Sequence, residues 1–233
     1  MFNQNELKRK AAYKAAEYIE SGMILGLGTG STVQYLFERM AELIAAGDLK
    51  DLKCIASSKR TELEADRLKI PLSDLNKNPG IDLTIDGADE VDKNLNLIKG
   101  GGGAMLREKI LFQASKKVVI VIDESKYSNK LGDKSLLPVE VVPIALETEK
   151  IFLESLGFQI KLRNDKSGNM FIADEGNYII DVETGKIDDP QDLAALLNKR
   201  AGIIEHGLFT NNMVSSVLIA GSSGGVRILL RED

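Results

Sequence analysis

Short apolar segments alternate with helix-like segments along the first half of the chain, and this alternation constrains the fold more than any other feature. The apolar, often β-branched runs predict strands at 23–27, 52–57, 81–86, 94–100 and 117–123. Between and before them, the spacing of apolar residues predicts helices at 3–20, 33–46, 59–69 and 104–116. Strands and helices that alternate at these lengths indicate an α/β fold with a mostly parallel sheet covered on both faces.

The pattern changes after about residue 131. Strands and helices are expected there in the order strand, helix, two or three strands, helix, strand, at 136–144, 147–157, 158–164, 169–173, 177–182, 190–199 and 201–207. This order is typical of a small α+β unit of split βαβ type. Two late strands, 215–221 and 225–230, either return to the first sheet or form a hairpin. We therefore expect one domain at 1–131 plus 207–233 and a smaller one at 132–206.

Composition excludes several classes of partner. The chain has 233 residues, a formal net charge of -5 and no dense Lys/Arg block, so no nucleic-acid partner is expected. No apolar run reaches the length of a bilayer, and the start is polar and helix-like, which predicts no membrane partner and a cytoplasmic location. Cys54 stands alone in an apolar stretch and is interpreted as a buried strand residue rather than a nucleophile.

Four polar segments follow predicted strands directly: 29–32, 86–89, 99–103 and 123–126. Parallel strands end at one edge of a sheet, where α/β proteins bind ligands, so these segments should share one rim. The segment GLGTGST lacks the third glycine of a dinucleotide fingerprint, because Ser31 or Val33 occupies that position. It suits a single phosphate at a helix N-terminus, although a turn whose Ser or Thr merely caps the helix fits equally well.

Three carboxylates have spacings that suit acid–base chemistry. Asp86 and Asp89 come just after an apolar strand, and they are either acid–base groups or part of a solvated acidic turn. Glu108 lies near the start of a helix, where a surface position would need no further explanation. The glycines at 100–103 shift the interpretation toward a site, because bare backbone lets a ligand approach N–H groups.

Hydrolase and metal sites are not favoured. GSSGG at 221–225 matches the G-x-S-x-G pattern of hydrolases, but the chain's single histidine, His206, precedes it. It is interpreted as a glycine turn between strands. One histidine and one cysteine are too few nitrogen and sulfur ligands for a zinc site, so no metal is expected.

Five motifs occur together in order: GLGTGST, DGADEVD, KGGGGAMLREKI, DESK and LLPVEVVP. In this combination the chain resembles ribose-5-phosphate isomerases of the A type over nearly its whole length. The resemblance implies a Rossmann-like sheet domain with a smaller ferredoxin-like domain, and interconversion of ribose 5-phosphate and ribulose 5-phosphate in the non-oxidative pentose phosphate pathway. It also implies a small sugar phosphate as the ligand, no metal or organic cofactor, and a homodimer or tetramer.

Carried onto this sequence, the resemblance implies a substrate site with the residues Thr29, Gly30, Ser31, Thr32, Asp86, Gly87, Ala88, Asp89, Lys99, Gly100, Gly101, Gly102 and Lys126, with Lys8 adding positive charge. Glu108 occupies the position of the catalytic base, which would move a proton between C2 and C1 through an enediolate. Lys99 would stabilise the enediolate, and Asp86 with Asp89 would move hydroxyl protons. The rival interpretation is a non-catalytic sugar-phosphate sensor, which would need the phosphate seat but not Glu108.

Overall fold

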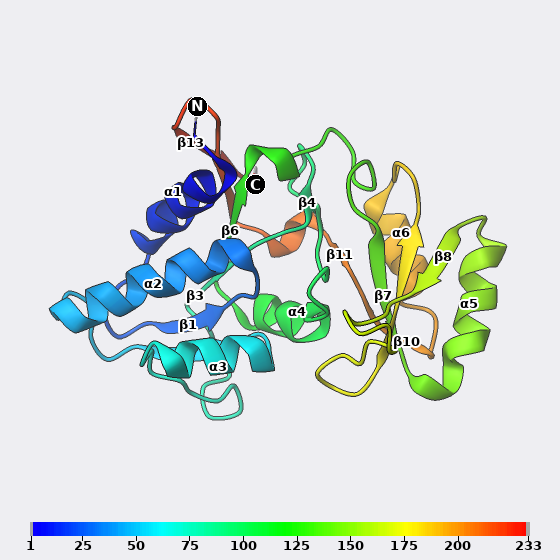
Figure 1. The fold of residues 1–233 in the computed structure, drawn as a ribbon, viewed down its shortest axis with the longest axis horizontal. Helices are drawn as coiled ribbons and strands as arrows, with labels where there is room; N and C mark the ends of the chain where they lie inside the picture. The colour runs from blue at the N-terminus through cyan, green and yellow to red at the C-terminus, as the bar shows by residue number, and fades with distance from the viewer. Residues whose placement is uncertain (1, 232–233) are drawn as a thin grey trace. The chain divides into compact units, whose positions relative to one another are not determined.

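The computed structural model describes residues 2–231, which form two compact units (Figure 1). Unit 1 comprises the described residues of 1–88, 107–127 and 211–233, and unit 2 comprises 89–106 and 128–210. The segment 89–106 thus groups with unit 2, whereas the sequence predicted a division at residues 131/132 and 206/207. The predicted division into domains at 1–131 plus 207–233 and 132–206 stays a prediction.

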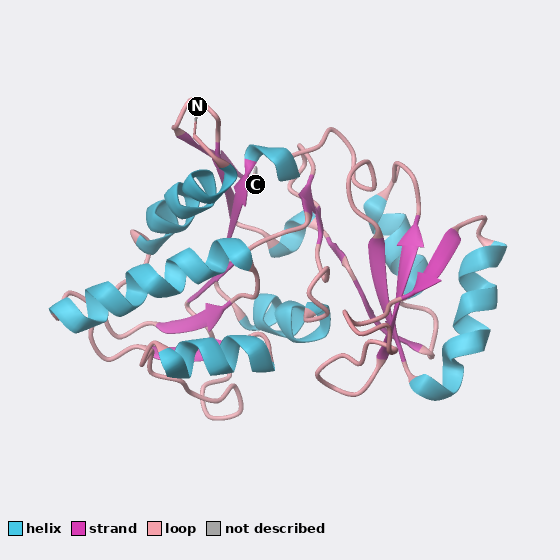
Figure 2. Cartoon of the chain, viewed as in Figure 1, coloured by secondary structure: helices cyan, strands magenta, loops and turns pink. Residues whose placement is uncertain are grey.

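Unit 1 is built on a six-stranded sheet with the order β13-β12-β6-β3-β1-β2. Figure 2 draws the strands in magenta and the helices in cyan. The strands are β1 Ile24–Leu27, β2 Lys53–Ala56, β3 Leu83–Asp86, β6 Val118–Asp123, β12 Ser216–Ala220 and β13 Val226–Leu230. All neighbours pair in parallel except β13, which runs antiparallel to β12. The predicted mostly parallel sheet is confirmed. The two late strands both return to this sheet and form a hairpin: β12 pairs with β6 on one side and with β13 on the other.

The helices of unit 1 have sequence signals at their ends. They are α1 Gln4–Ala16, α2 Ser31–Ala46, α3 Lys59–Arg67 and α4 Met105–Ala114, with the short 3₁₀ helices η1 Glu124–Lys126 and η3 Asn211–Met213; the first two residues of α4 group with unit 2. Asn3 and Glu6 form a capping box at the start of α1. Gly47 ends α2 in a left-handed conformation, at φ 79°. Buried side chains such as Leu25, Phe37 and Ile85 form the core.

The strand order of unit 1 creates a topological switch point. Among the parallel strands the order is β2-β1-β3-β6-β12, so the chain moves from β1 to one side of the sheet and from β3 to the other. In such doubly wound sheets ligands bind beyond the carboxyl ends of the strands, where the connections diverge. The loop after β1 and the end of β3 therefore mark the expected binding position.

Unit 2 contains a four-stranded antiparallel sheet with the order β10-β7-β9-β8. Its elements follow one another as β7 Leu137–Val141, α5 Leu146–Ser155, β8 Gln159–Leu162, β9 Tyr178–Glu183, α6 Pro190–Leu197 and β10 Ile203–His206, with η2 Pro143–Ala145 before α5. This is the β-α-β-β-α-β order of ferredoxin-like units, so the predicted α+β fold is confirmed. The core includes Val139, Leu153, Ile180 and Leu197.

A second, three-stranded sheet completes unit 2, and one predicted strand is missing. The small sheet has the order β11-β5-β4, with β4 Glu90–Val91, β5 Leu97–Ile98 and β11 Leu208–Phe209. The expected strand at 169–173 forms only isolated bridges, from Met170 to Asn164 and from Ile172 to Tyr178. The side chain of Asp165 accepts the N–H groups of residues 167 and 169, and this local turn competes with a regular ladder.

Within residues 2–231, no helix combines the length and the apolar character that crossing a bilayer requires.

Candidate active site

The loop after β1 is fastened to the end of β3. The N–H of Gly28 donates to the carbonyl oxygen of Ile85 at 3.0 Å, and the N–H of Thr29 donates to Oδ1 of Asp86 at 3.0 Å. A Cβ atom on Gly28 would lie 2.1 Å from that same Oδ1 and 2.6 Å from the Asp86 Cα. The close approach of loop and carboxylate therefore requires glycine at this position.

The start of α2 leaves its first N–H groups without a side-chain cap. Its N-cap is Gly30, at φ 141°, a conformation that favours glycine, and among residues 2–231 no side-chain cap accepts a hydrogen bond from the first turn. The alternative in which a Ser or Thr caps α2 is therefore not what the structure contains. Lys8 Nζ donates to Ser31 Oγ at 3.0 Å. Uncapped N–H groups, a hydroxyl and an ammonium group together suit an anion.

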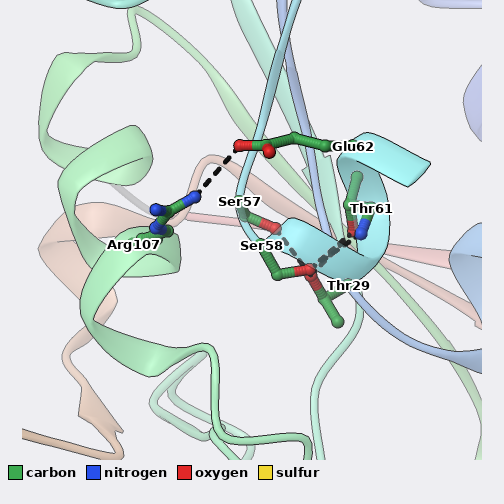
Figure 3. Close-up of polar contacts among 6 residues, drawn as sticks. All are labelled: Thr29, Ser57, Ser58, Thr61, Glu62 and Arg107. Carbon is green, nitrogen blue, oxygen red and sulfur yellow. Dashed lines mark hydrogen bonds and ion pairs between the residues drawn. The ribbon is translucent and has the colours of Figure 1, made fainter. Parts of the chain in front are cut away.

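A cluster of four hydroxyl groups joins this loop to the start of α3. The hydroxyl cluster consists of Thr29, Ser57, Ser58 and Thr61, and the oxygens of the last three lie 2.9, 2.8 and 2.9 Å from Thr29 Oγ1 (Figure 3). Ser57 and Ser58 follow β2 directly, at the same edge of the sheet. These two serines were not among the predicted site residues, although a polar pair between a strand and a helix is the same signal that marked the other loops.

Asp86 and Glu108 both belong to this edge of unit 1. Asp86 ends β3, is 0% exposed, and accepts N–H groups from Thr29 and, at 2.7 Å, from Gly87. Glu108 lies in the first turn of α4 and is 3% exposed, so it is not a surface helix residue. Its neighbour Arg107 pairs with Glu62 in the first turn of α3 at 3.0 Å (Figure 3). The turn that carries Glu108 is thus adjacent to the turn that contacts Thr29.

Lys126 follows β6 at the carboxyl edge of the same sheet. It ends η1, which Asp123 caps by accepting the N–H of Ser125 at 3.0 Å. The other oxygen of Asp123 accepts a weak bond from Gln4 Nε2 at 3.4 Å, which connects the end of β6 with the start of α1. Lys126 is half-buried and forms no ion pair with a described residue.

The remaining predicted residues lie in unit 2. Asp89 accepts the N–H of Gly101 through Oδ2 at 2.7 Å. The N–H of Lys99 donates to the carbonyl oxygen of Gly207 at 2.9 Å, and its Nζ lies 5.7 Å from the centre of the Phe209 ring. In the described part of the chain, no hydrogen bond involves the N–H groups of Gly100 and Gly102. Those two donors are available to a ligand.

Arg163, which was not among the predicted site residues, holds the glycine segment 100–101 from its carbonyl side. Its Nη1 donates to the carbonyl oxygens of Gly100 at 2.7 Å and Gly101 at 3.3 Å. The guanidinium also forms a two-bond ion pair with Asp181, and both side chains are mostly buried. No local pattern indicates a contact between residue 163, just after β8, and a loop more than 60 positions earlier.

The acidic motif at 86–92 divides into two kinds of carboxylate. Glu90 is 0% exposed and accepts the N–H groups of residues 132, 133, 134 and 135 at 3.0–3.3 Å. Asp92 accepts the N–H groups of Asn94 and Asn96 and the Asn96 amide at 2.8–2.9 Å. These two carboxylates organise loops of unit 2, which leaves Asp86 and Asp89 as the candidates for chemistry.

The alternatives set aside from the sequence have structural explanations. Cys54 is buried in β2, and burial raises the pKa of its thiol to about 12. Residues 221–225 form the turn between β12 and β13, closed by a 3.0 Å bond from the N–H of Gly221 to the carbonyl oxygen of Gly225. No group of three or more His, Cys, Asp and Glu side chains among residues 2–231 is arranged to hold a metal ion.

Known proteins match the chain over almost its full length. The family model for ribose 5-phosphate isomerase A (phosphoriboisomerase A) matches residues 53–224. A ribose-5-phosphate isomerase A of Desulfatibacillum aliphaticivorans is 50% identical over 224 residues, covering 96% of this chain and 97% of the relative. A probable ribose-5-phosphate isomerase 2 of Arabidopsis thaliana is 48% identical over 229 residues, covering 95% of this chain and 85% of the relative.

Solved structures agree with the sequence comparison. A D-ribose-5-phosphate isomerase in complex with phospho-erythronic acid superposes with a TM-score of 0.95 at 36% identity, covering 99% of this chain and 100% of that one. The ribose 5-phosphate isomerase of Plasmodium falciparum superposes with a TM-score of 0.94 at 42% identity, covering 98% and 100% of the two chains. The chain therefore belongs to the ribose-5-phosphate isomerase A family.

Proposed function

We propose that the chain interconverts D-ribose 5-phosphate and D-ribulose 5-phosphate in the non-oxidative pentose phosphate pathway. Membership of the isomerase family supports this activity. The structural observation that carries it is the bond from the Thr29 N–H to Asp86 at the switch point of the sheet. The first turn of α4, with Glu108, lies at the same edge of unit 1.

The substrate phosphate is proposed to bind at the start of α2. The uncapped N–H groups of that turn, with the hydroxyls of Ser31 and Thr32, provide donors in a region of positive potential. Gly30 lets the backbone approach the phosphate. Lys8 already donates to Ser31 Oγ, and Lys126 at the end of β6 adds a second positive charge.

Glu108 is proposed as the base that moves the proton. It takes the proton from C2 of the open-chain aldose, leaving an enediolate, and returns it to C1 to give the ketose. In the reverse direction the base takes the proton from C1 and returns it to C2. Negative charge then develops on the substrate oxygens. We assign its stabilisation to the Lys99 ammonium group and the N–H groups of Gly100 and Gly102. The sequence motif supports the part played by Lys99.

Asp86 and Asp89 are proposed to move the hydroxyl protons that accompany this transfer and to help open the furanose ring. Asp86 Oδ1 is fixed by two N–H groups, so the orientation of its carboxylate is set before substrate binds. Gly87 and Ala88 continue the chain between the two aspartates and line the site. No metal ion takes part in this proposal.

A homodimer in the cytoplasm is proposed as the working form. Unit 2 exposes two large apolar side chains on η2 and α5, Ile144 at 96% and Ile151 at 66%, and burying them between subunits would be favourable. Light scattering coupled to size-exclusion chromatography distinguishes a dimer from a monomer or tetramer.

The activity is tested by adding ribose 5-phosphate to the purified protein in the presence of EDTA and following ribulose 5-phosphate. We expect conversion by the wild-type protein. Glu108→Gln keeps the size of the side chain but removes the base, so kcat should fall by about two to four orders of magnitude while KM changes little. Glu38→Gln, at an exposed position on α2, is the matched control and should keep wild-type kcat.

Two contrary results have different meanings. A folded wild-type protein that binds the sugar phosphate without converting it would contradict the isomerase proposal and favour the sensor. Wild-type turnover in Glu108→Gln would leave the activity in place and remove Glu108 from the role of base.

A further inference from the structure

The hydroxyl cluster buries three side chains that no part of the proposed mechanism uses. Ser57, Ser58 and Thr61 are 1%, 4% and 3% exposed, and all three hydroxyls surround Thr29 Oγ1 (Figure 3). They come from the loop after β2 and the first turn of α3, whereas Thr29 belongs to the loop after β1. The cluster therefore joins two consecutive loops at the edge of the sheet where the substrate is proposed to bind.

Counting protons shows what the Thr29 hydroxyl can do. Each hydroxyl has one proton to donate. Thr61 donates to the carbonyl oxygen of Gly28 at 2.9 Å, Ser58 donates to Thr61 at 3.0 Å, and Thr29 donates to Ser58 at 2.8 Å. Because the Thr29 proton is used, the 2.9 Å contact with Ser57 must have Ser57 as its donor. With these donors all four protons are used inside the protein, and the 2.9 Å contact between the hydroxyl oxygens of Thr29 and Thr61 has no proton of its own.

The oxygens of a phosphate group at neutral pH mainly accept hydrogen bonds, so a hydroxyl must donate its proton to bind them. A hydroxyl whose proton is already donated elsewhere cannot do so. We propose that Thr29 serves the substrate through its backbone rather than its hydroxyl, and that Ser58 and Thr61 are positioning residues for the isomerase reaction. This inference rests on the proposed function, because it concerns the loop that is assigned to the substrate phosphate.

The geometry shows how the positioning works. Thr61 fixes the carbonyl oxygen of Gly28, the chain of hydroxyls fixes the side chain of Thr29, and Asp86 fixes the Thr29 N–H. The segment between two glycines is thereby ordered just before α2 begins. A loop that is ordered in advance loses less conformational entropy when it binds a ligand, so breaking the chain should weaken substrate binding more than it slows chemistry.

The test uses Thr29→Val, Thr61→Val and the double variant, with KM for ribose 5-phosphate and kcat measured separately. Each valine keeps the shape of the side chain and removes one link. We expect each single variant to raise KM about three- to tenfold, with kcat within about twofold of wild type. The double variant should resemble either single variant, because one chain is broken in all three. Ser58→Ala is avoided because Ser58 also caps α3.

Two further variants separate positioning from general loss of stability. Thr61→Ser keeps the hydroxyl and should retain wild-type KM. Thr84→Val removes a buried hydroxyl from the 2.7 Å pair with Ser115 in the same sheet, and it should lower the melting temperature without changing KM. Thermal denaturation of every variant accompanies the kinetics.

Two results would overturn the inference. If Thr29→Val raises KM while Thr61→Val keeps the wild-type value, the Thr29 hydroxyl binds the substrate directly. If neither variant changes KM, the cluster has no part in positioning. Both comparisons are made against the isomerase activity of the wild-type protein. If the wild-type protein has no such activity, the proposed function is contradicted, and the positioning inference is not what has failed.

Discussion

The Thr29 N–H and the Asp86 carboxylate are joined by a 3.0 Å hydrogen bond across the switch point of the sheet. β1 and β3 are parallel neighbours, so the loop that leaves one lies beside the end of the other. The bond makes the orientation of the carboxylate depend on the shape of the loop. A change that moves the loop should therefore alter both the phosphate seat and the acid–base group.

Gly28→Ala tests this dependence. The added Cβ would lie 2.1 Å from Asp86 Oδ1 and 2.6 Å from the Asp86 backbone, so either the loop or the end of β3 must move. We expect the free energy of unfolding to fall by about 1–3 kcal/mol and kcat/KM to fall at least tenfold. Urea denaturation and the isomerase assay measure the two effects.

Gly80→Ala is the control for Gly28→Ala, because a Cβ at Gly80 would meet no heavy atom within 4 Å. It should leave kcat/KM unchanged and alter stability little. Wild-type activity in Gly28→Ala would show that the approach of the loop to Asp86 is not needed for catalysis.

Arg163→Met tests whether the glycine segment must be held from its carbonyl side. The substitution keeps much of the length of the side chain but removes the bonds to the carbonyl oxygens of Gly100 and Gly101. It also leaves Asp181 without its ion-pair partner. We expect kcat/KM to fall by about one order of magnitude, since the N–H groups assigned to the enediolate would lose their orientation.

Lys161→Met removes a positive charge from an exposed position on β8, two residues before Arg163, and should keep the wild-type rate. Arg163→Met/Asp181→Leu removes both charges of the pair. If this double variant recovers full activity, the loss in Arg163→Met came from the unpaired Asp181 and not from the glycine segment.

Cys54 should be unreactive in the folded protein. Burial raises the pKa of its thiol to about 12, so almost no thiolate forms at pH 8 and reagents have no access. Iodoacetamide should leave the native protein unmodified and add one carbamidomethyl group after unfolding in urea, as mass spectrometry would detect. Rapid labelling of the native protein at pH 8 would contradict the buried assignment.

The sequence predicted most elements, and the edge of the parallel sheet for 29–32 and 123–126, because both depend on local patterns. The same expectation was wrong for 99–103, because the preceding strand β5 pairs antiparallel in the three-stranded sheet of unit 2. Alternating strands and helices identify a parallel sheet, and a polar loop after a strand must then lie at its carboxyl edge. Of the two or three strands expected between α5 and α6, two form; the third, at 169–173, makes only isolated bridges beside the turn held by Asp165. Local propensity does not include such a competing turn.

What the sequence could not reveal depends on contacts between distant segments. Glu90 and Asp92 look as suitable for acid–base chemistry as Asp86, until residues 132–135 are seen to donate to Glu90. The hydroxyl cluster exists because β1 and β2 are neighbours, which brings Thr29 to Ser58. Pairing of this kind follows from the three-dimensional arrangement and leaves no periodic signal in the chain.

Glu140 gives unit 2 a stability that depends on pH. The side chain is 1% exposed on β7, and its Oε2 has no hydrogen-bond partner among the described residues. Burial raises the pKa of its carboxyl above the ordinary value of 4.5; a hydrogen bond from Asn177 opposes this, and the nearby charges of Glu205, Glu175 and Asp174 add to it.

The native state therefore holds the Glu140 proton more tightly than the unfolded chain does. The resulting stabilisation is fully present below pH 4.5 and is lost as the pH rises through the raised pKa. Glu140→Gln removes this titration while keeping the size of the side chain. In urea denaturation, we expect the free energy of unfolding of the wild-type protein, relative to Glu140→Gln, to decrease as the pH rises above 4.5 and to level off once the pH exceeds the raised pKa.

Glu183→Gln, an exposed position on the neighbouring strand β9, is the matched control and should follow the wild-type curve. The sign of the trend distinguishes a buried, protonated carboxyl from an ionised, paired one. A carboxylate that gained a partner on folding would make the wild-type protein more stable, relative to Glu140→Gln, as the pH rises. A difference that grows in that direction would mean that Glu140 is ionised and paired in solution, contrary to its environment on β7.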